Sequence, residues 1–163
     1  MEILEYILLV IITFSGTILG IALSNIASEE IKPSYKYIKF ASLLFLPIIT
    51  ALLAANFGMI YFAAAFAITC LLTFLVTKQR HWITYPITAV ALAIAAKTAF
   101  LLEISVIIFL YAMILTIIQA SQILSDKQRA AISKKENIKL FNASMKQYFS
   151  YIIIALIAYF IFK

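Results

Sequence analysis

Four long apolar stretches constrain the fold of this 163-residue chain more than any other feature of its sequence. They cover residues 3–27, 40–77, 82–124 and 148–162. A helix needs about 20 apolar residues to cross the roughly 30 Å hydrocarbon core of a bilayer. Composition agrees, because 65% of the residues are hydrophobic and only 12% are charged, against about half and about one quarter in an average soluble domain. The sequence therefore predicts a protein that folds in lipid, not a soluble domain or a disordered chain.

The two longest stretches are each long enough for two helices. The first is predicted to break at Asn56-Phe57-Gly58, because Asn and Gly tolerate left-handed turn geometry. The second is predicted to break between Lys97 and Glu103, the only charges inside it. Strands are not expected, because the stretches do not alternate between apolar and polar residues. We expect an all-α, polytopic transmembrane bundle in one integral membrane domain, with helices at residues 3–27, 40–57, 59–77, 82–97, 100–124 and 146–162.

The basic residues fall on alternate connections between these helices. Eleven of the 13 lie in or directly beside the loops expected at 28–39, 78–81 and 125–145: Lys32, Lys36, Lys39, Lys78, Arg80, Lys127, Arg129, Lys134, Lys135, Lys139 and Lys146. The positive-inside rule assigns these loops to the cytoplasm and both termini to the outside of a cell membrane. The six helices then form three hairpins, each closed by a basic loop. The candidate contacts to anionic lipid headgroups are Lys32, Lys36, Lys39, Lys78, Arg80, Lys134, Lys135 and Lys139.

The first basic loop carries a recognisable segment, Ala27-Ser28-Glu29-Glu30-Ile31-Lys32-Pro33-Ser34-Tyr35-Lys36-Tyr37. It resembles an Ala-Pro-Glu-Glu-Ile/Leu-Lys-x-Gly-x-Lys-Tyr segment of small polytopic membrane proteins of archaea, which have no established activity. Ser28 and Ser34 replace the Pro and the Gly of that pattern. The resemblance implies an archaeal plasma membrane. Pro33 is expected to end any helix that begins near Ser28.

The third basic loop is expected to contain a helix of its own. Ile138, Phe141, Met145 and Tyr148 recur at three- and four-residue spacing, while Lys135, Lys139 and Lys146 occupy the other face. This pattern is typical of an amphipathic helix at the membrane surface. We expect it to run into the last membrane helix, which looks short by itself.

The first helix carries a stripe of small residues, Gly16, Gly20 and Ser24, at four-residue spacing. A G-x-x-x-G stripe lets two helix backbones approach closely in lipid. The contact it predicts is either within the chain or between subunits. The spans otherwise contain few polar residues, mostly threonines, whose hydroxyls can bond to their own helix: Thr13, Thr50, Thr69, Thr73, Thr84, Thr88 and Thr116.

Residues for catalysis or cofactor binding are scarce. His81 is the only His and Cys70 the only Cys, and about 16 Å of helix would separate them, so we expect neither a metal nor another cofactor. No pair of carboxylates lies inside a span, so no catalytic residue is predicted. Lys97 and Glu103 either mark the external turn or pair at the mouth of a pathway.

The sequence thus favours a non-enzymatic membrane component or accessory subunit. Its expected partners are membrane lipids, a second copy of the chain or a larger membrane complex, and not nucleic acid. One alternative is a small oligomeric channel or transporter. The other is a lipid-modifying enzyme that uses the cytoplasmic carboxylates Glu29 and Glu30 with Lys32 and Lys36.

Overall fold

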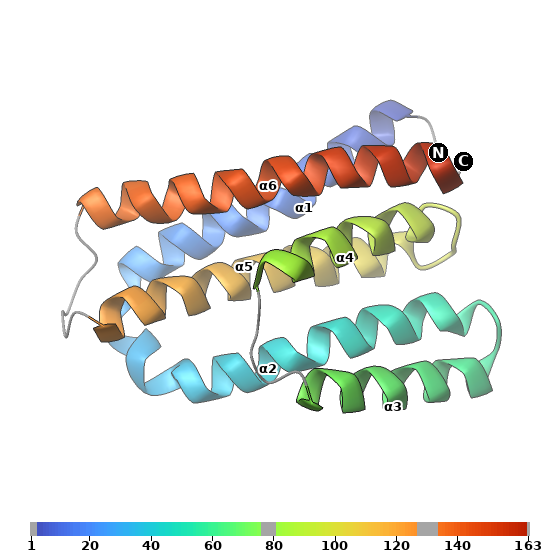
Figure 1. The fold of residues 1–163 in the computed structure, drawn as a ribbon, viewed down its shortest axis with the longest axis horizontal. Helices are drawn as coiled ribbons and strands as arrows, with labels where there is room; N and C mark the ends of the chain where they lie inside the picture. Colours follow the sequence, from blue (N-terminus) through green and yellow to red (C-terminus); the bar gives the residue numbers. More distant parts are fainter. Residues whose placement is uncertain (1–2, 76–80, 127–133, 163) are drawn as a thin grey trace.

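The computed structural model describes residues 3–75, 81–126 and 134–162, and all regular structure in them is α-helical (Figure 1). The helices are α1 (Ile3–Ile26), α2 (Ser28–Ala55), α3 (Met59–Leu75), α4 (His81–Ala95), α5 (Leu101–Asp126) and α6 (Lys134–Phe162). The predicted all-α class is confirmed. The helices lie side by side in an elongated bundle, as expected when backbone groups must be satisfied within each segment.

Four of these helices contain segments long and apolar enough to cross a membrane: Ile3–Ile26, Pro33–Ala55, Leu101–Gln122 and Ile138–Phe162. The apolar parts of α3 and α4, Met59–Leu72 and Thr84–Ala95, are shorter. Figure 1 shows that both helices occupy only part of the length of the bundle. The structure is therefore that of a membrane-type bundle with four long helices and two short ones.

Both predicted turns inside the long apolar stretches are found. After α2, Asn56 caps the helix and Gly58 adopts a φ of +121°, a value that favours glycine. After α4, the chain turns over residues 96–100, where the amide of Thr98 donates to the carbonyl of Ala95 at 2.8 Å. These two turns and both ends of the described chain lie at the same end of the bundle (Figure 1). We call this the terminal end.

The opposite end, where α1 meets α2 and where α6 begins, is more helical than the sequence predicts. The loop expected at 28–39 is wrong, because α2 begins at Ser28 and contains Pro33. The hydrogen bond that Pro33 cannot donate would go to the carbonyl of Glu29, an exposed residue of the first turn that water can reach. Ile31 is buried on the same turn and fixes it against the bundle.

The loop expected at 125–145 is likewise wrong for its second half, because α6 begins at Lys134. The prediction of a helix that runs into the last membrane helix is confirmed, since α6 is continuous to Phe162. Its bundle-facing side near the start carries Glu136, Leu140 and Ser144, and Ile138 faces outward.

The expected arrangement of three hairpins is wrong. The most extensive helix contacts are those of α1 with α5, α2 with α3 and α4 with α6, and α2 also packs on α5. Helices joined at the basic connections touch little, and no Cα atoms of α3 and α4 approach within 8 Å in the described residues. The connections fix only which ends meet, whereas packing follows the shapes of the helix faces.

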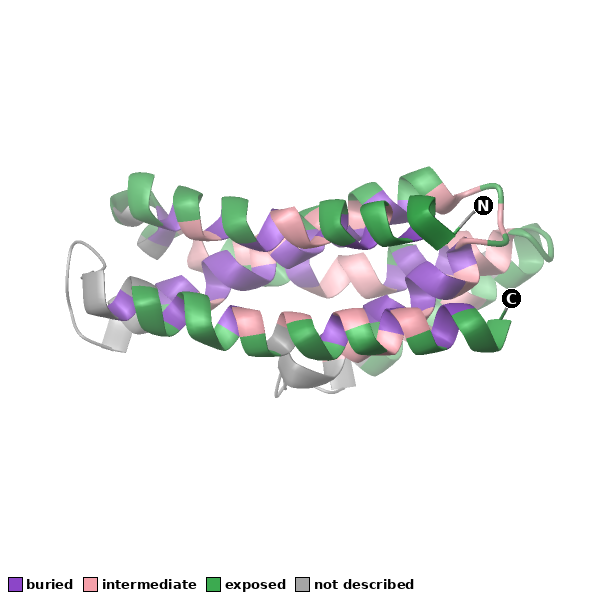
Figure 2. Cartoon of the chain, turned by 90° about the horizontal axis from the view of Figure 1, so that it is seen from above, coloured by how far each residue is buried: buried purple, intermediate pink, exposed green. Residues whose placement is uncertain are grey.

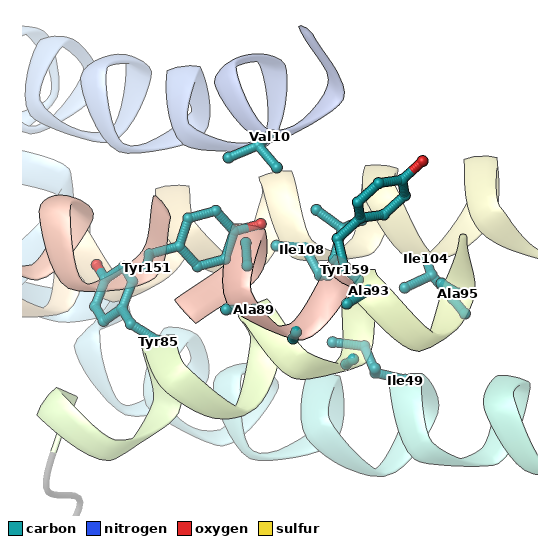
Figure 3. Close-up of a cluster of buried hydrophobic side chains, with 14 of the residues drawn as sticks. Val10, Ile49, Tyr85, Ala89, Ala93, Ala95, Ile104, Ile108, Tyr151 and Tyr159 are labelled. Carbon is teal, nitrogen blue, oxygen red and sulfur yellow. The ribbon is translucent and has the colours of Figure 1, made fainter. Parts of the chain in front are cut away.

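The core lies between α1, α4, α5 and α6, with a contribution from α2. Figure 2 shows the buried positions on the inward faces of the helices and the exposed ones on the outer faces. Buried side chains include Val10, Ile49, Ile104 and Tyr151 (Figure 3). None of the described side chains of α3 is buried. The bundle therefore has a packed group of helices and one peripheral helix.

Candidate functional site

A small cavity lies between α1, α4, α5 and α6. Its volume is about 20 Å³. Residues that bear hydroxyls or aromatic rings are common in its walls, although the surface they present to the cavity is mostly apolar: Thr13, Phe14, Thr17, Tyr85, Thr88, Ile108, Tyr111, Ala112, Leu115, Tyr148 and Tyr151. No charged side chain belongs to this lining. We call it the hydroxyl cavity.

The small residues of α1 bring α5 close enough to form one wall of this cavity. A Cβ atom added to Gly20 would lie 2.6 Å from the carbonyl oxygen of Met113 and 2.9 Å from Cβ of Thr116. One added to Gly16 would collide with the carbonyl of Phe109. Ser24 is fully buried and donates to the carbonyl of Gly20 at 2.6 Å. The stripe singled out in the sequence thus lies inside the chain, at the contact between α1 and α5.

A hydrogen bond between side chains joins α1 to α6 beside the cavity. The hydroxyls of Thr13 and Tyr151 are 3.0 Å apart. Thr13 donates its one proton to the carbonyl of Val10 at 2.8 Å, so Tyr151 is the donor in the bond between the helices. Further along, Tyr6 donates to the carbonyl of Ala155 at 3.1 Å. Tyrosines therefore tie α1 and α6 together along their length.

Two hydroxyls of the cavity wall have no partner among the described residues. They are Oγ1 of Thr17, whose side chain is 1% exposed, and the phenolic oxygen of Tyr85, which is 6% exposed. The hydroxyl of Tyr85 lies close to those of Thr17 and Thr116, although neither pair meets strict hydrogen-bond criteria. Figure 3 shows Tyr85 on α4 and Tyr151 on α6 in the space between their helices.

The predicted headgroup contacts gather at the end opposite the terminal end. Lys36 and Lys39 in the first half of α2 and Lys139 near the start of α6 are exposed. Lys32, Lys134 and Lys135 belong to the first turns of the same two helices. Lys78 and Arg80 lie outside the described residues. Helices α2 and α6 therefore bring the described headgroup candidates to the half of the bundle in which these two helices begin.

Lys97 and Glu103 lie at the terminal end, in the turn after α4 and the first turn of α5. Both are exposed, and neither lines the hydroxyl cavity. The structure thus places them at a surface turn and away from the hydroxyl cavity.

Metal-ligating side chains are scattered in the described residues. In the part of the chain that the structure describes, no group of three such residues is close enough to hold a metal ion. Glu29 and Glu30 are exposed on the first turn of α2. Glu136, which the sequence places in a loop, is instead 6% exposed on α6. The sequence did not predict the burial of Glu136, because it did not predict that α6 begins at Lys134.

Sequence reasoning noted the threonines but missed the tyrosines that surround them. Tyrosine in membrane proteins is enriched at the two interfaces, where its hydroxyl meets water. Tyr111 lies near the centre of Leu101–Gln122, and Tyr151 near the centre of Ile138–Phe162. A tyrosine this far from either interface needs a polar neighbour, and that signal was present in the sequence.

Comparisons with known proteins add no assignment to this geometry. No family model, no curated protein and no solved structure matches the chain.

Proposed function

We propose that the protein is a multi-pass component of the plasma membrane, without catalytic activity, whose basic end faces the cytoplasm and binds anionic lipid headgroups. The carrying observation is that the exposed Lys36, Lys39 and Lys139 all lie in the first halves of α2 and α6, which begin at one end of the bundle, while both ends of the described chain lie at the other. Lysines near a membrane surface that carries anionic lipid contribute about 1 kcal/mol each to binding. The proposal includes a role as an accessory subunit, and the archaeal setting that residues 27–37 indicate.

In the proposed topology all six helices lie in the membrane, and the terminal end is external. The orientation does not depend on how deeply α3 and α4 penetrate. The chain leaves α2 and enters α5 at the terminal end, so α3 and α4 together begin and finish there. The four long helices then determine on which side of the membrane each of the remaining connections lies.

The orientation is tested with two single-cysteine variants in a Cys70→Ser background, Lys97→Cys and Lys139→Cys. Both positions are exposed, at opposite ends of the bundle. A membrane-impermeant maleimide applied to intact cells should label the first and spare the second until the cells are opened. The reverse pattern would refute a cytoplasmic basic end.

Lipid binding is tested by reversing the charges of Lys36, Lys39 and Lys139 to Glu together. Protein purified from vesicles of mixed anionic and zwitterionic lipid should retain markedly less anionic lipid after this change. Lys97→Glu is the matched control, because it alters an exposed lysine at the terminal end. Equal retention by the triple variant and the unaltered protein would remove the headgroup function.

One observation favours a second candidate function, a small channel or transporter. Substrate sites in transporters commonly lie near the middle of the bilayer, and the hydroxyl cavity lies about halfway along three long helices. Solute or ion flux into proteoliposomes that exceeds that of protein-free vesicles, and that changes in a Thr17→Val variant, would replace the first proposal by this one. Equal flux would exclude transport of the solute used.

A further inference from the structure

The terminal end gives a common level from which depths along the helices can be compared. The turns that join α2 to α3 and α4 to α5 both lie there, and so does the last turn of α6 (Figure 1). An α-helix rises about 1.5 Å per residue, so the number of residues counted from this end measures depth in the bundle.

The first charged residue met on α2 and on α6, counting from the terminal end, lies at the same depth. Lys39 comes 16 residues before Ala55, the last residue of α2, and Lys146 comes 16 residues before Phe162, the last residue of α6. Both positions are therefore about 24 Å from the terminal end. Both lysines are exposed. On these two helices the charge-free surface ends at this depth.

The helical residues of α3 and α4 reach nearly the same depth. Helix α3 has 17 residues and α4 has 15, so their lengths are about 25 Å and about 22 Å. A lysine can stretch its side chain towards the headgroups from a deeper backbone position, but the length of a helix is fixed by its backbone. The four helices α2, α3, α4 and α6 thus mark one boundary in two independent ways.

Helices α1 and α5 do not share this boundary. Helix α1 carries no charge after Glu5, and α5 carries none between Glu103 and Asp126. Each of these charge-free stretches is more than 30 Å long by the same measure, enough for an ordinary bilayer. The shorter apolar height therefore belongs only to α2, α3, α4 and α6.

An ordinary bilayer does not match this shorter height. Its hydrocarbon core is about 30 Å thick, which is about 6 Å more than the depth of Lys39 and Lys146. Both lysines would then leave the helix inside the hydrocarbon, and neither α3 nor α4 alone would cover its full thickness. A bilayer responds to such a mismatch by thinning next to the protein, at a cost of fractions of a kcal/mol per Å. Lipids with shorter acyl chains reduce this cost.

We propose that α2, α3, α4 and α6 form an interaction surface for a thin lipid layer, about 24 Å across its hydrocarbon, and that phospholipids with short acyl chains gather against it. In such a layer Lys39 and Lys146 lie at the level of the headgroups, and the first turns of α2 and α6 stand outside the hydrocarbon. The inference rests on the membrane placement proposed above, but not on the orientation or on the charge of the headgroups.

The test is lipid enrichment around the full chain in vesicles made of equal parts of dimyristoleoyl and dioleoyl phosphatidylcholine. Protein extracted from them in polymer-bounded nanodiscs should carry several-fold more of the shorter lipid than the bulk vesicles do. Both lipids have the same zwitterionic headgroup, so headgroup charge cannot produce this enrichment. An unchanged ratio of the two lipids would overturn the proposal and would leave the anionic headgroup function, which has its own test, intact.

A double variant, Lys39→Leu with Lys146→Leu, tests the boundary itself. It lengthens the charge-free surface of both helices by at least three residues, so the enrichment in the shorter lipid should fall. The matched control is Lys36→Leu with Lys139→Leu, which removes two exposed lysines from the same helices beyond the boundary and should leave the enrichment unchanged. An equal fall in both variants, or no fall in either, would refute a boundary at Lys39 and Lys146.

Unfolding of the unaltered protein gives a second readout that needs no variant. In vesicles of a single lipid, the unfolding equilibrium constant should be lowest in dimyristoleoyl phosphatidylcholine and rise through dioleoyl to dierucoyl phosphatidylcholine, because mismatch costs free energy. A minimum in dioleoyl or dierucoyl lipid would show that the bundle fits a bilayer of ordinary or greater thickness, and would overturn the proposal.

Discussion

Helices α1 and α3 meet the rest of the bundle in opposite ways, although both are strongly apolar. The inward stripe of α1 is buried and consists of Tyr6, Val10, Thr13, Gly16, Thr17, Gly20 and Ser24. Within the described residues, α3 packs only on α2 and buries none of its described side chains. Lipid tails are as apolar as leucine, so hydrophobicity alone does not drive one membrane helix onto another. Helix α1 differs from α3 in the close approach of its backbone to α5 and in its hydrogen bonds to α6. The predictions below measure that difference.

The largest expected effect is the loss of close approach between α1 and α5. Gly16→Ala and Gly20→Ala each place a methyl group into the backbone of α5. Overpacking costs about 1–3 kcal/mol, and we expect values at the top of this range because a rigid helix backbone cannot yield. The free energy of unfolding in mixed micelles measures the effect.

The matched control for the glycine variants is Ala67→Leu, an enlargement at an exposed position of α3. It should leave stability within about 0.5 kcal/mol of the unaltered protein. An equal loss in Ala67→Leu and in the glycine variants would mean that α3 is as tightly packed as α1, which would break the comparison.

An intermediate effect is expected for truncated leucines. Leu92 on α4 is fully buried, whereas Leu71 on α3 is 62% exposed. Leu→Ala in soluble cores costs roughly 2–5 kcal/mol. In lipid much of the transfer contribution disappears, which leaves about 1–2 kcal/mol for the cavity created by Leu92→Ala. Leu71→Ala should be nearly neutral by the same unfolding assay, because lipid fills the space. A substantial loss at Leu71 would reveal a protein neighbour on α3.

Lipid tails are as apolar as leucine, and this also explains which features of the fold were predictable from the sequence. Turns were predictable, because Gly58 and the charges around residues 97–103 interrupt apolar runs in a way that a membrane helix does not tolerate. The pairing of α1 with α5 was not, because helices that are apolar all round carry no pattern that separates an inward face from a lipid face. The Gly16 and Gly20 stripe marked the right face of α1 but not its partner.

The candidate site was predictable only in parts. Thr13 and Thr88 were recognised as polar residues inside spans, and each does bond to its own helix. Their meeting with Tyr85 and Tyr151 depends on contacts across four helices that no local pattern encodes. Helix α2 was misjudged at Ser28 because Pro33 stops helices in water more strictly than it does in a helix that tertiary contacts hold in place.

The smallest expected effect is a difference in coupling energy between two hydrogen-bonded pairs of hydroxyls that have the same oxygen–oxygen distance. Thr13 and Tyr151 join α1 to α6 at 3.0 Å, and Thr50 and Thr69 join α2 to α3 at 3.0 Å. Double-mutant cycles with Thr→Val and Tyr→Phe should give a coupling of about 0.6–1.7 kcal/mol for the first pair, the range found between membrane helices. The second pair should give less.

The reason for this difference lies in the alternatives that each hydroxyl has. Each hydroxyl has one proton, so the threonine that donates to the other gives up a carbonyl of its own helix, Ala65 at 2.6 Å for Thr69 or Pro47 at 2.9 Å for Thr50, and it can return to that carbonyl when the other is removed. A tyrosine hydroxyl stands too far from its own backbone for such a bond, and Tyr151 therefore depends on Thr13. Equal couplings for the two pairs would show that α3 is held as specifically as α1. The distinction between them would then rest on close approach alone.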